Sequence, residues 1–214
     1  MNYQKELDHL IEKLEASGTP KKLLIHSCCA PCSSYVLEYL TKYFEITVFY
    51  YNPNIYPEEE YHRRAEEQQR LIREIPKGYP ITFRQGTFEP KDYYETVKGL
   101  EGEPEGGQRC FRCYRFRLEE AARMAKEGGY DYFTTTLSIS PHKNAEKLNE
   151  IGRELAAEYG VNFLPSDFKK KNGYRRSIEL SREYNLYRQD YCGCVYSMRE
   201  REQMKAASRD NESI

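Results

Sequence analysis

The chain has 214 residues, 31% of them charged, and a formal net charge of −1. This length suits a single domain. The near-neutral balance excludes strong attraction of nucleic acid by the molecule as a whole, so a polyanionic partner must meet a local basic patch. No stretch approaches the roughly 20 apolar residues that cross a bilayer, and the polar, acidic N-terminus does not resemble a signal peptide. We therefore expect a cytoplasmic protein with no membrane partner.

Short β-rich runs alternate with longer stretches of helical spacing along the chain. A first helix is expected before Gly18, where glycine and then proline end the pattern. Strands are predicted at residues 22–26, 46–51, 79–83, 130–136 and 161–164. Further helices are predicted from Pro31, from Pro57, around Cys110 and from Pro141, and helical pieces follow residue 176.

The predicted fold class is α/β, a single domain over residues 1–214 with a mostly parallel sheet flanked by helices and a helical C-terminal part. The core is expected over about residues 21–197, and the tail after about residue 205 is expected to fray. Sites in such sheets form beyond the carboxyl ends of strands, where Cys28 and Cys29 follow the first predicted strand. Residues 99–107, acidic and glycine-rich, are expected to form a flexible loop that could act as a lid.

The seven cysteines lie in three short groups far apart in the sequence. They are Cys28, Cys29 and Cys32; Cys110 and Cys113; and Cys192 and Cys194. Inside a cell thiols stay mostly reduced, so this clustering indicates metal binding or catalysis rather than structural disulfides. Cysteine also selects iron–sulfur clusters and zinc over hard cations. We expect folding to bring the three groups into one site.

Four of these cysteines, Cys28, Cys29, Cys110 and Cys113, suffice for a cubane 4Fe–4S cluster. A structural zinc site usually takes two C-x-x-C-like pairs, and adjacent cysteines fit that pattern poorly because their side chains diverge. The residues therefore favour iron–sulfur binding, with a zinc site and thiol redox chemistry as alternatives.

The other three cysteines leave more than one role open. Cys32 falls in the first turn of a predicted helix, where the N-terminal amides favour a thiolate, so it is a candidate ligand for a further metal ion, a reactive thiol or a small buried residue. A disulfide between Cys192 and Cys194 would close a small, strained and easily reduced ring. That pair is interpreted as redox-active or as metal ligands, and Asp190 beside it as a proton donor, a metal ligand or a solvated residue.

Basic residues gather near the second cysteine group and at residues 169–176. Such runs are usually solvated faces, but beside tyrosines they also suit phosphate contacts with stacking platforms. The residues predicted to contact a nucleic acid are Arg112, Lys169, Lys170, Arg175 and Arg176.

Six motifs together resemble a known family, the QueH-type epoxyqueuosine reductases, from about residue 21 to residue 197. They are His26-Ser-Cys-Cys-Ala-Pro-Cys32, Tyr51-Asn-Pro-Asn54, Arg109-Cys-Phe-Arg-Cys113, Thr134-Thr-Thr-Leu137, Ser140-Pro-His-Lys143 and Tyr187-Arg-Gln-Asp-Tyr-Cys-Gly-Cys194. The resemblance implies an oxidoreductase that removes the epoxide oxygen of epoxyqueuosine in tRNA, the last step of queuosine biosynthesis. It also implies a 4Fe–4S cluster in place of cobalamin.

Carried over to this sequence, the resemblance makes Cys28, Cys29, Cys110 and Cys113 the cluster ligands. Cys192 and Cys194 become the redox-active pair or ligands of an additional iron, and the electron donor stays unidentified. The implied fold is similar to the adenine-nucleotide hydrolase-like superfamily. There a glycine-rich phosphate loop follows the first strand, whereas here residues 27–34 supply cysteines instead, so ATP use is not expected.

The chemistry supports this reading, because converting an epoxide to an alkene consumes two electrons and two protons and releases water. A 4Fe–4S cluster passes single electrons, so a second redox centre nearby must complete the pair. We expect Asp190 to donate a proton as the C–O bonds break. The rival interpretations are a zinc-stabilised RNA-binding module without catalysis and a thiol-disulfide oxidoreductase centred on Cys192 and Cys194. A tRNA sulfurtransferase is suggested by the fold alone.

Overall fold

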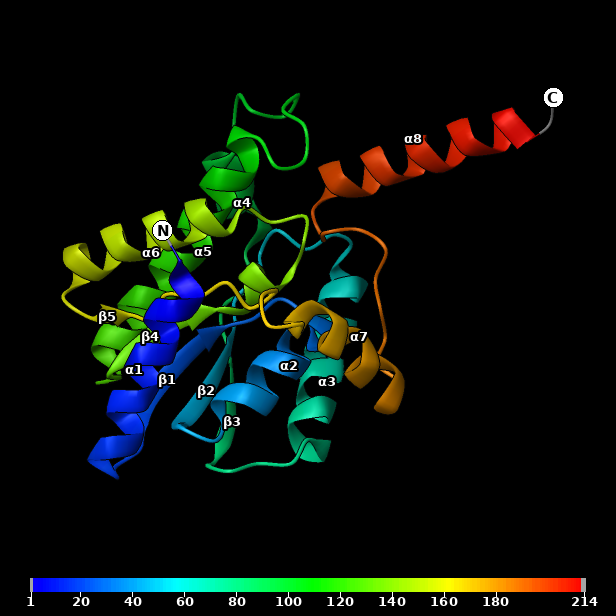
Figure 1. The fold of residues 1–214 in the computed structure, drawn as a ribbon. Helices are drawn as coiled ribbons and strands as arrows, with labels where there is room; N and C mark the ends of the chain where they lie inside the picture. Colours follow the sequence, from blue (N-terminus) through cyan, green and yellow to red (C-terminus); the bar gives the residue numbers. More distant parts are fainter. Residues whose placement is uncertain (1, 213–214) are drawn as a thin grey trace.

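A five-stranded parallel sheet lies between two layers of helices in the computed structural model, which describes residues 2–212 (Figure 1). Its strands have the order β3-β2-β1-β4-β5. They are β1 Lys21–His26, β2 Phe44–Tyr50, β3 Ile81–Gln85, β4 Tyr132–Thr135 and β5 Asn162–Phe163. In the register, Ile25 lies opposite Val48 on one side and Thr134 on the other. The predicted α/β class with a parallel sheet is confirmed.

Helices connect the strands and form the C-terminal part. They are α1 Tyr3–Ser17, α2 Ala30–Leu40, α3 Glu58–Glu74, α4 Pro90–Thr96, α5 Gln108–Glu127, α6 Ala145–Tyr159, α7 Gly173–Glu183 and α8 Val195–Glu212, with a 3-10 helix η1 at Thr136–Ile139. Gly18 closes α1 with a φ of 64°, as its position in the pattern predicted. The helix predicted from Pro141 instead begins at Ala145, because the Asn144 side chain caps it by accepting a bond from the Lys147 amide.

The two faces of the sheet bury separate apolar clusters. Along β1, Leu23 and Ile25 pack against the cluster that includes α1, α2 and α3. Leu24 points the other way, into the cluster formed with α5 and α6. Because successive side chains of a strand alternate between faces, a continuous apolar run is what a strand covered on both sides requires. β1 is therefore a central strand, and the loop after it opens inside the protein.

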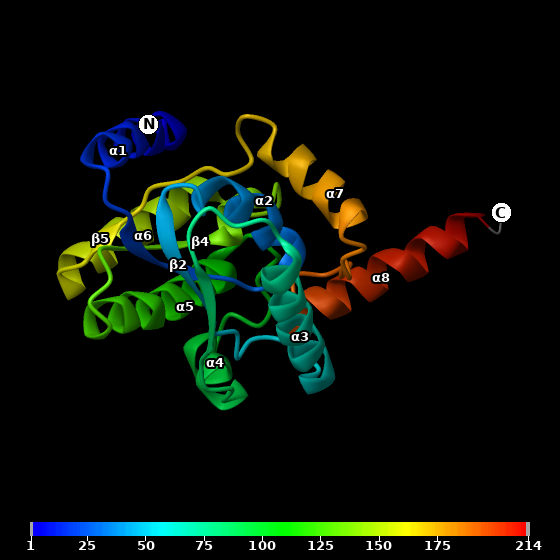
Figure 2. The ribbon, with the colours of Figure 1, turned by 90° about the horizontal axis from the view of Figure 1, so that it is seen from below.

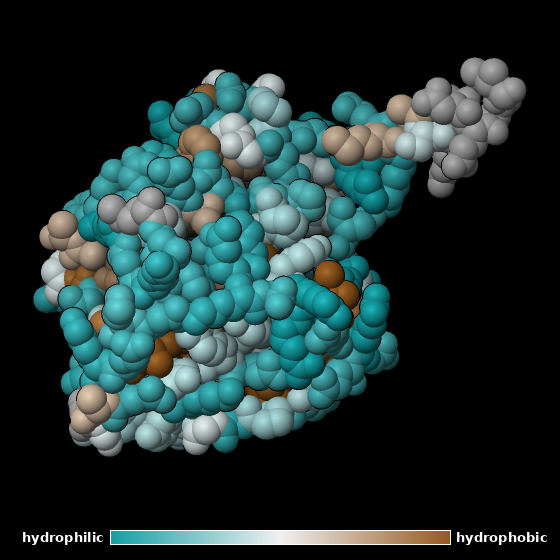
Figure 3. Space-filling model, viewed as in Figure 1, coloured by the Kyte–Doolittle hydropathy of each residue, from teal (hydrophilic) through white to brown (hydrophobic). Residues whose placement is uncertain are grey.

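The C-terminal part extends beyond the sheet. α7 packs on α2, and α8 projects away from the body of the molecule (Figures 1 and 2). The backbone stays helical to Glu212, so the residues after 205 continue α8 in this structure. No helix within residues 2–212 is long and apolar enough to cross a membrane. The face seen in Figure 3 is mostly hydrophilic, with small apolar spots between polar residues.

Gly152 provides a test of how α6 packs on β5. A Cβ at this position would overlap the ring of Phe163. We expect Gly152→Ala to lower the free energy of unfolding by about 1–3 kcal/mol through overpacking, despite the better helix propensity of alanine. Urea denaturation measures this, with Gly102→Ala as the control because a Cβ there meets nothing within 4 Å. Equal stability of the two variants would contradict the packing described here.

Candidate metal centre

The cysteine site lies at the switch point of the sheet. The chain leaves β1 toward β2 and β3 on one side, and β4 and β5 lie on the other. The loop after β1 carries Cys28 and Cys29 at this point, and Cys32 follows in the first turn of α2. The rule that sites form beyond strand carboxyl ends thus placed these residues correctly.

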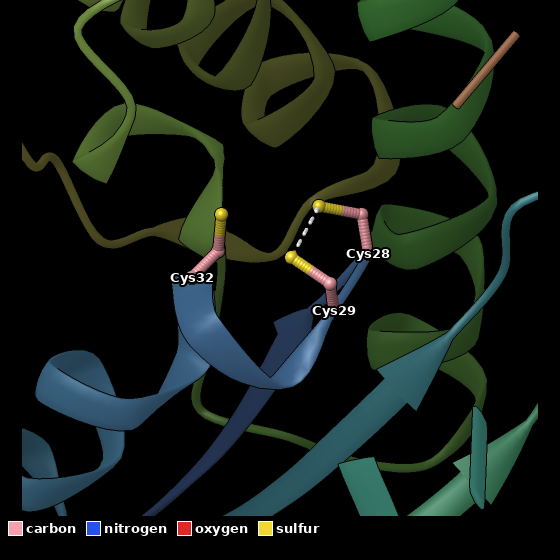
Figure 4. A group of neighbouring side chains, drawn as sticks. All are labelled: Cys28, Cys29 and Cys32. Carbon is pink, nitrogen blue, oxygen red and sulfur yellow. Dashed lines mark hydrogen bonds between the residues drawn. The ribbon is translucent and has the colours of Figure 1, made fainter. Parts of the chain in front are cut away.

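The first group brings three sulfurs together. The Sγ atoms of Cys28, Cys29 and Cys32 all lie within 4.8 Å of one another, with Cys28 Sγ 3.8 Å from Cys29 Sγ (Figure 4). Hydrogen bonding to Cys29 raises the pKa of Cys28 to about 12, whereas bonds from Cys28 and then Cys32 lower the pKa of Cys29. Hydrogen bonding to Cys28 raises the pKa of Cys32. Without a cation only one of the three readily becomes a thiolate, whereas a bound metal would let all three ionise.

The second group lies in the first turns of α5 and faces the same region. Cys110 belongs to the buried cluster that also contains Cys28 and Cys29, and Cys113 to a cluster with Cys194. Burial raises the pKa of Cys113 to about 12, and negative charge on Cys194, Cys192 and Cys110 adds to that rise. Members of different cysteine groups thus share buried clusters, but a single site formed by Cys28, Cys29, Cys110 and Cys113 stays a prediction. Among the described residues, the closest sulfur group is nevertheless the trio with Cys32.

The third group turns sharply around Gly193. This glycine has a φ of 140°, and its carbonyl accepts a hydrogen bond of 2.8 Å from the Tyr56 amide. Cys192 lines the cavity described below, whereas Cys194 is buried against Cys113. Both are free thiols in this structure. Cys192 thus lies at the cavity and Cys194 in a buried cluster. Their role as a redox pair or as metal ligands stays a prediction.

Besides Arg109, which is buried and pairs with Glu200 at 2.9 Å, three buried cations lie near the cysteines, and sequence reasoning did not select them as site residues. Lys143 Nζ lies 2.9 Å from Cys192 Sγ and 2.9 Å from Glu105 Oε1. Arg64 pairs with Glu60 at 2.7 Å and donates to the Cys192 carbonyl at 3.0 Å. Arg117 is the third. Burial disfavours the ammonium of Lys143, but Cys192, Tyr114 and Glu105 together outweigh it and raise the pKa of Lys143 well above its usual value.

Two of these cations carried a weak signal in the sequence. Lys143 ends the Ser140-Pro-His-Lys143 motif. Arg117 follows Cys113 by four residues, so Cys113 and Arg117 lie on one face of α5. Neither spacing shows that the cation is buried. Only the tertiary structure brings Lys143 to a sulfur 49 residues away.

A cavity of about 450 Å³ opens onto the sulfurs. Cys28, Cys32 and Cys192 line it together with the cations Arg117 and Lys143. Its polar and aromatic lining also includes Glu105, Ser140, His142, Tyr174, Ser177, Arg188, Gln189, Asp190, Tyr191 and Arg201. The volume is within the range of small-molecule sites. A substrate in this cavity would meet sulfur, fixed positive charge and phenol groups.

Asp190 lies in the lining of the cavity, as its neighbouring cysteines suggested, but its charge state is fixed by a partner. Its carboxylate pairs with Lys205 on α8 and lies 3.9 Å from Arg201. The hydrogen bond from Lys205 lowers the pKa of Asp190 below its usual value. At neutral pH this side chain is a carboxylate, which holds α8 near the cavity. Its role as a proton donor stays a prediction.

The residues predicted to bind tRNA fall into two kinds. Lys169, Arg175 and Arg176 form ion pairs with Asp167, Glu179 and Glu38, respectively. Arg112 and Lys170 are exposed, and neither has an ion pair with another residue of the described range 2–212. An exposed pair such as Arg175 with Glu179 contributes about 0–1 kcal/mol, so a phosphate can replace the carboxylate, whereas Arg112 and Lys170 have no ion pair to break. Phosphate contact stays a prediction for all five.

The fold and the site define an α/β protein whose switch point carries free thiols around a cavity, an arrangement typical of a metal- or thiol-dependent enzyme. Residues 23–200 match the model of the family described as epoxyqueuosine reductase QueH. The chain belongs to this family.

Relatives with the same description cover most of the chain. The protein of Streptococcus pyogenes is 46% identical over 92% of this chain and 78% of its own length. The protein of Staphylococcus epidermidis is 44% identical over 100% of this chain and 92% of its own length, and that of Thermotoga maritima is 37% identical over 86% and 94%. The resemblance deduced from the motifs is confirmed.

Glu67 on α3 holds the segment that carries the third cysteine group. It accepts a 2.7 Å hydrogen bond from the Tyr187 amide and another from Arg70, which itself donates to the Tyr184 carbonyl. The hydrogen bond from Arg70 lowers the pKa of Glu67 below its usual 4.5. The stabilisation is therefore fully present above pH 4.5 and is lost as pH falls through the lower value of the folded state.

We expect Glu67→Gln to lower the free energy of unfolding at pH 7 by about 1–2 kcal/mol, and the difference from the unmodified protein to shrink at pH 3. Urea denaturation at both pH values measures this. Glu66→Gln, one residue earlier on α3 and exposed, is the control with no expected change. A difference that stays constant between pH 7 and pH 3 would contradict the charged tether.

Proposed function

We propose that this chain reduces epoxyqueuosine in tRNA to queuosine, with a 4Fe–4S cluster and without cobalamin. The relatives' shared name, epoxyqueuosine reductase, supports the reaction. The main support for an iron–sulfur cofactor is the cavity, which is lined with cysteine sulfurs and buried cations. The names of the relatives do not support a zinc-stabilised RNA-binding module or a general thiol-disulfide oxidoreductase.

The residues present fit an iron–sulfur cluster. A buried cation is stable only beside negative charge, and thiolates bound to iron would supply it to Arg117, which has no carboxylate partner within residues 2–212. The proposed ligands are Cys28, Cys29, Cys110 and Cys113. The short distances of Cys32 to the first two make it an equal candidate, for the cluster or for an additional iron. When bound, the cluster would supply single electrons to the cavity.

Side chains of this protein would bind the substrate oxygen and supply the protons. Lys143, charged and in the cavity wall, would donate a hydrogen bond to the epoxide oxygen, a task for which the carboxylate of Asp190 lacks the proton at neutral pH. Oxidation of the Cys192 and Cys194 dithiol to a disulfide would release two electrons and two protons, which balances the conversion of an epoxide to an alkene and water. Alternatively, these thiols bind an additional iron.

The partners follow from the reaction. The substrate is tRNA that carries epoxyqueuosine, and an unidentified reductant restores the centre after each turnover. We place the reaction in the cytoplasm, where thiols stay reduced.

The cofactor is tested on protein purified without oxygen. We expect about four iron and four sulfide per chain, and we expect Cys110→Ala to lose most of both, together with the electron paramagnetic resonance signal of the reduced protein. Cys32→Ala is the companion variant, which should keep the sulfide if Cys32 binds only an additional iron. Zinc in place of iron, or full deoxygenation activity in Cys110→Ala, would rule out the assigned cluster.

Binding of tRNA is tested with the two predicted contact residues, Arg112 and Lys170, that are exposed and have no ion pair within residues 2–212. We expect Arg112→Ala and Lys170→Ala each to weaken tRNA binding and to reduce the slope of log affinity against log salt by about one. Arg123→Ala is the control, because Arg123 lies near the far end of α5 and pairs with Glu120 and Glu127. Equal losses in all three variants, measured by filter binding over a salt series, would show that no local patch exists.

A further inference from the structure

Arg117 is a buried cation of the site that has no carboxylate partner within residues 2–212. Its side chain leaves the buried face of α5, and the residue is 1% exposed. Nε donates to the Cys113 carbonyl at 3.3 Å and Nη1 to Asn52 Oδ1 at 3.3 Å. No ion pair joins it to an acidic residue anywhere in the described range 2–212. A guanidinium does not deprotonate in proteins, so a full positive charge is buried here.

The hydrogen bonds of Arg117 connect two cysteine segments. Asn52, which follows β2, accepts from Arg117 and donates through Nδ2 to the Ser27 carbonyl at 2.8 Å. Ser27 directly precedes Cys28. A continuous chain of bonds therefore runs from the helix that carries Cys110 and Cys113 to the loop that carries Cys28 and Cys29.

The charges around Arg117 are those of thiols. Arg117 lines the same cavity as Cys28, Cys32 and Cys192, and it donates a hydrogen bond to the carbonyl of Cys113. The other buried cations differ in this respect, because each has a carboxylate partner: Glu60 for Arg64, Glu105 for Lys143 and Glu200 for Arg109. Within residues 2–212, the groups beside Arg117 that could balance its charge are these cysteine sulfurs, once they are ionised or bound to a metal cluster.

We propose that Arg117 is a positioning residue that joins the two cysteine segments and, as their buried counter-charge, raises the reduction potential of the cluster they hold. This inference rests on the proposed function. Each electron added to the cluster makes it more negative, and a fixed positive charge nearby stabilises that reduced state. The enzyme would thus accept electrons from a weaker reductant than the same cluster would without Arg117.

The test separates charge from geometry. Arg117→Met removes both, whereas Arg117→Lys keeps the charge and loses the forked geometry that reaches Asn52 and Cys113. Iron and sulfide content report on assembly, and a redox titration followed by electron paramagnetic resonance reports on the potential. Arg123→Met, an exposed arginine on the same helix, is the matched control.

At a fixed potential we expect Arg117→Met to lower the ratio of reduced to oxidised cluster at least tenfold, which is about 59 mV for a one-electron couple. Arg117→Lys should keep the ratio within threefold while binding less iron, and Arg123→Met should match the unmodified protein. A wild-type ratio in Arg117→Met, or equal losses in Arg117→Met and Arg117→Lys, would overturn the counter-charge.

If Arg117→Met loses its cluster, a second variant still tests the positioning role. Asn52→Leu leaves the arginine in place but breaks its link to Ser27, so we expect lower iron content with an unchanged potential in the clusters that form. Normal iron content in this variant would overturn the positioning role. Zinc instead of iron in the unmodified protein would overturn the proposed function. The counter-charge role of Arg117 would then be tested by metal content, which must fall further in Arg117→Met than in Arg117→Lys.

Discussion

Burial of positive charge beside thiols is the constraint on which the site depends. Arg64, Arg117 and Lys143 are removed from water, and only two of them have carboxylates in contact. An unbalanced buried charge costs several kcal/mol, so the folded site requires negative charge from sulfur. Each thiol in turn resists ionisation when buried. The cations and the thiolates therefore stabilise one another, and a metal cluster bound by the thiolates would complete this balance.

The parallel sheet makes this balance between buried cations and thiolates possible, because it brings together segments that are distant in sequence. The loop after β1, the start of α5 and the turn at Gly193 all meet near the carboxyl ends of the central strands. Each segment brings sulfur, and α3 and α5 also bring the two arginines. The Glu67 tether fixes the third segment from the same helix that supplies Arg64. Position in the fold thus couples the stability of the C-terminal part to the geometry of the site.

Much of this was predictable from the sequence, and the remainder depended on contacts between distant segments. The apolar run of β1 and the glycine after α1 are local signals, so the sheet and the place of Cys28 followed from them. α4 was not predicted because its seven residues offer only Tyr93 to the core. The start of α6 was misplaced because a capping Asn144 outweighs a proline three residues earlier. Nothing local shows that Lys143 meets a sulfur or that Arg117 lacks a carboxylate.

The start of α2 shows how one electrostatic feature can serve two chemistries. In Rossmann-like nucleotide-binding folds, the loop after the first strand presents backbone amides to phosphate, whose negative charge suits a helix N-terminus. Here Cys29 occupies the N-cap position and Cys32 the first turn. The helix dipole that favours phosphate also favours a thiolate. Exchanging glycines for cysteines would therefore keep the preference for negative charge while replacing a phosphate cradle with metal ligands.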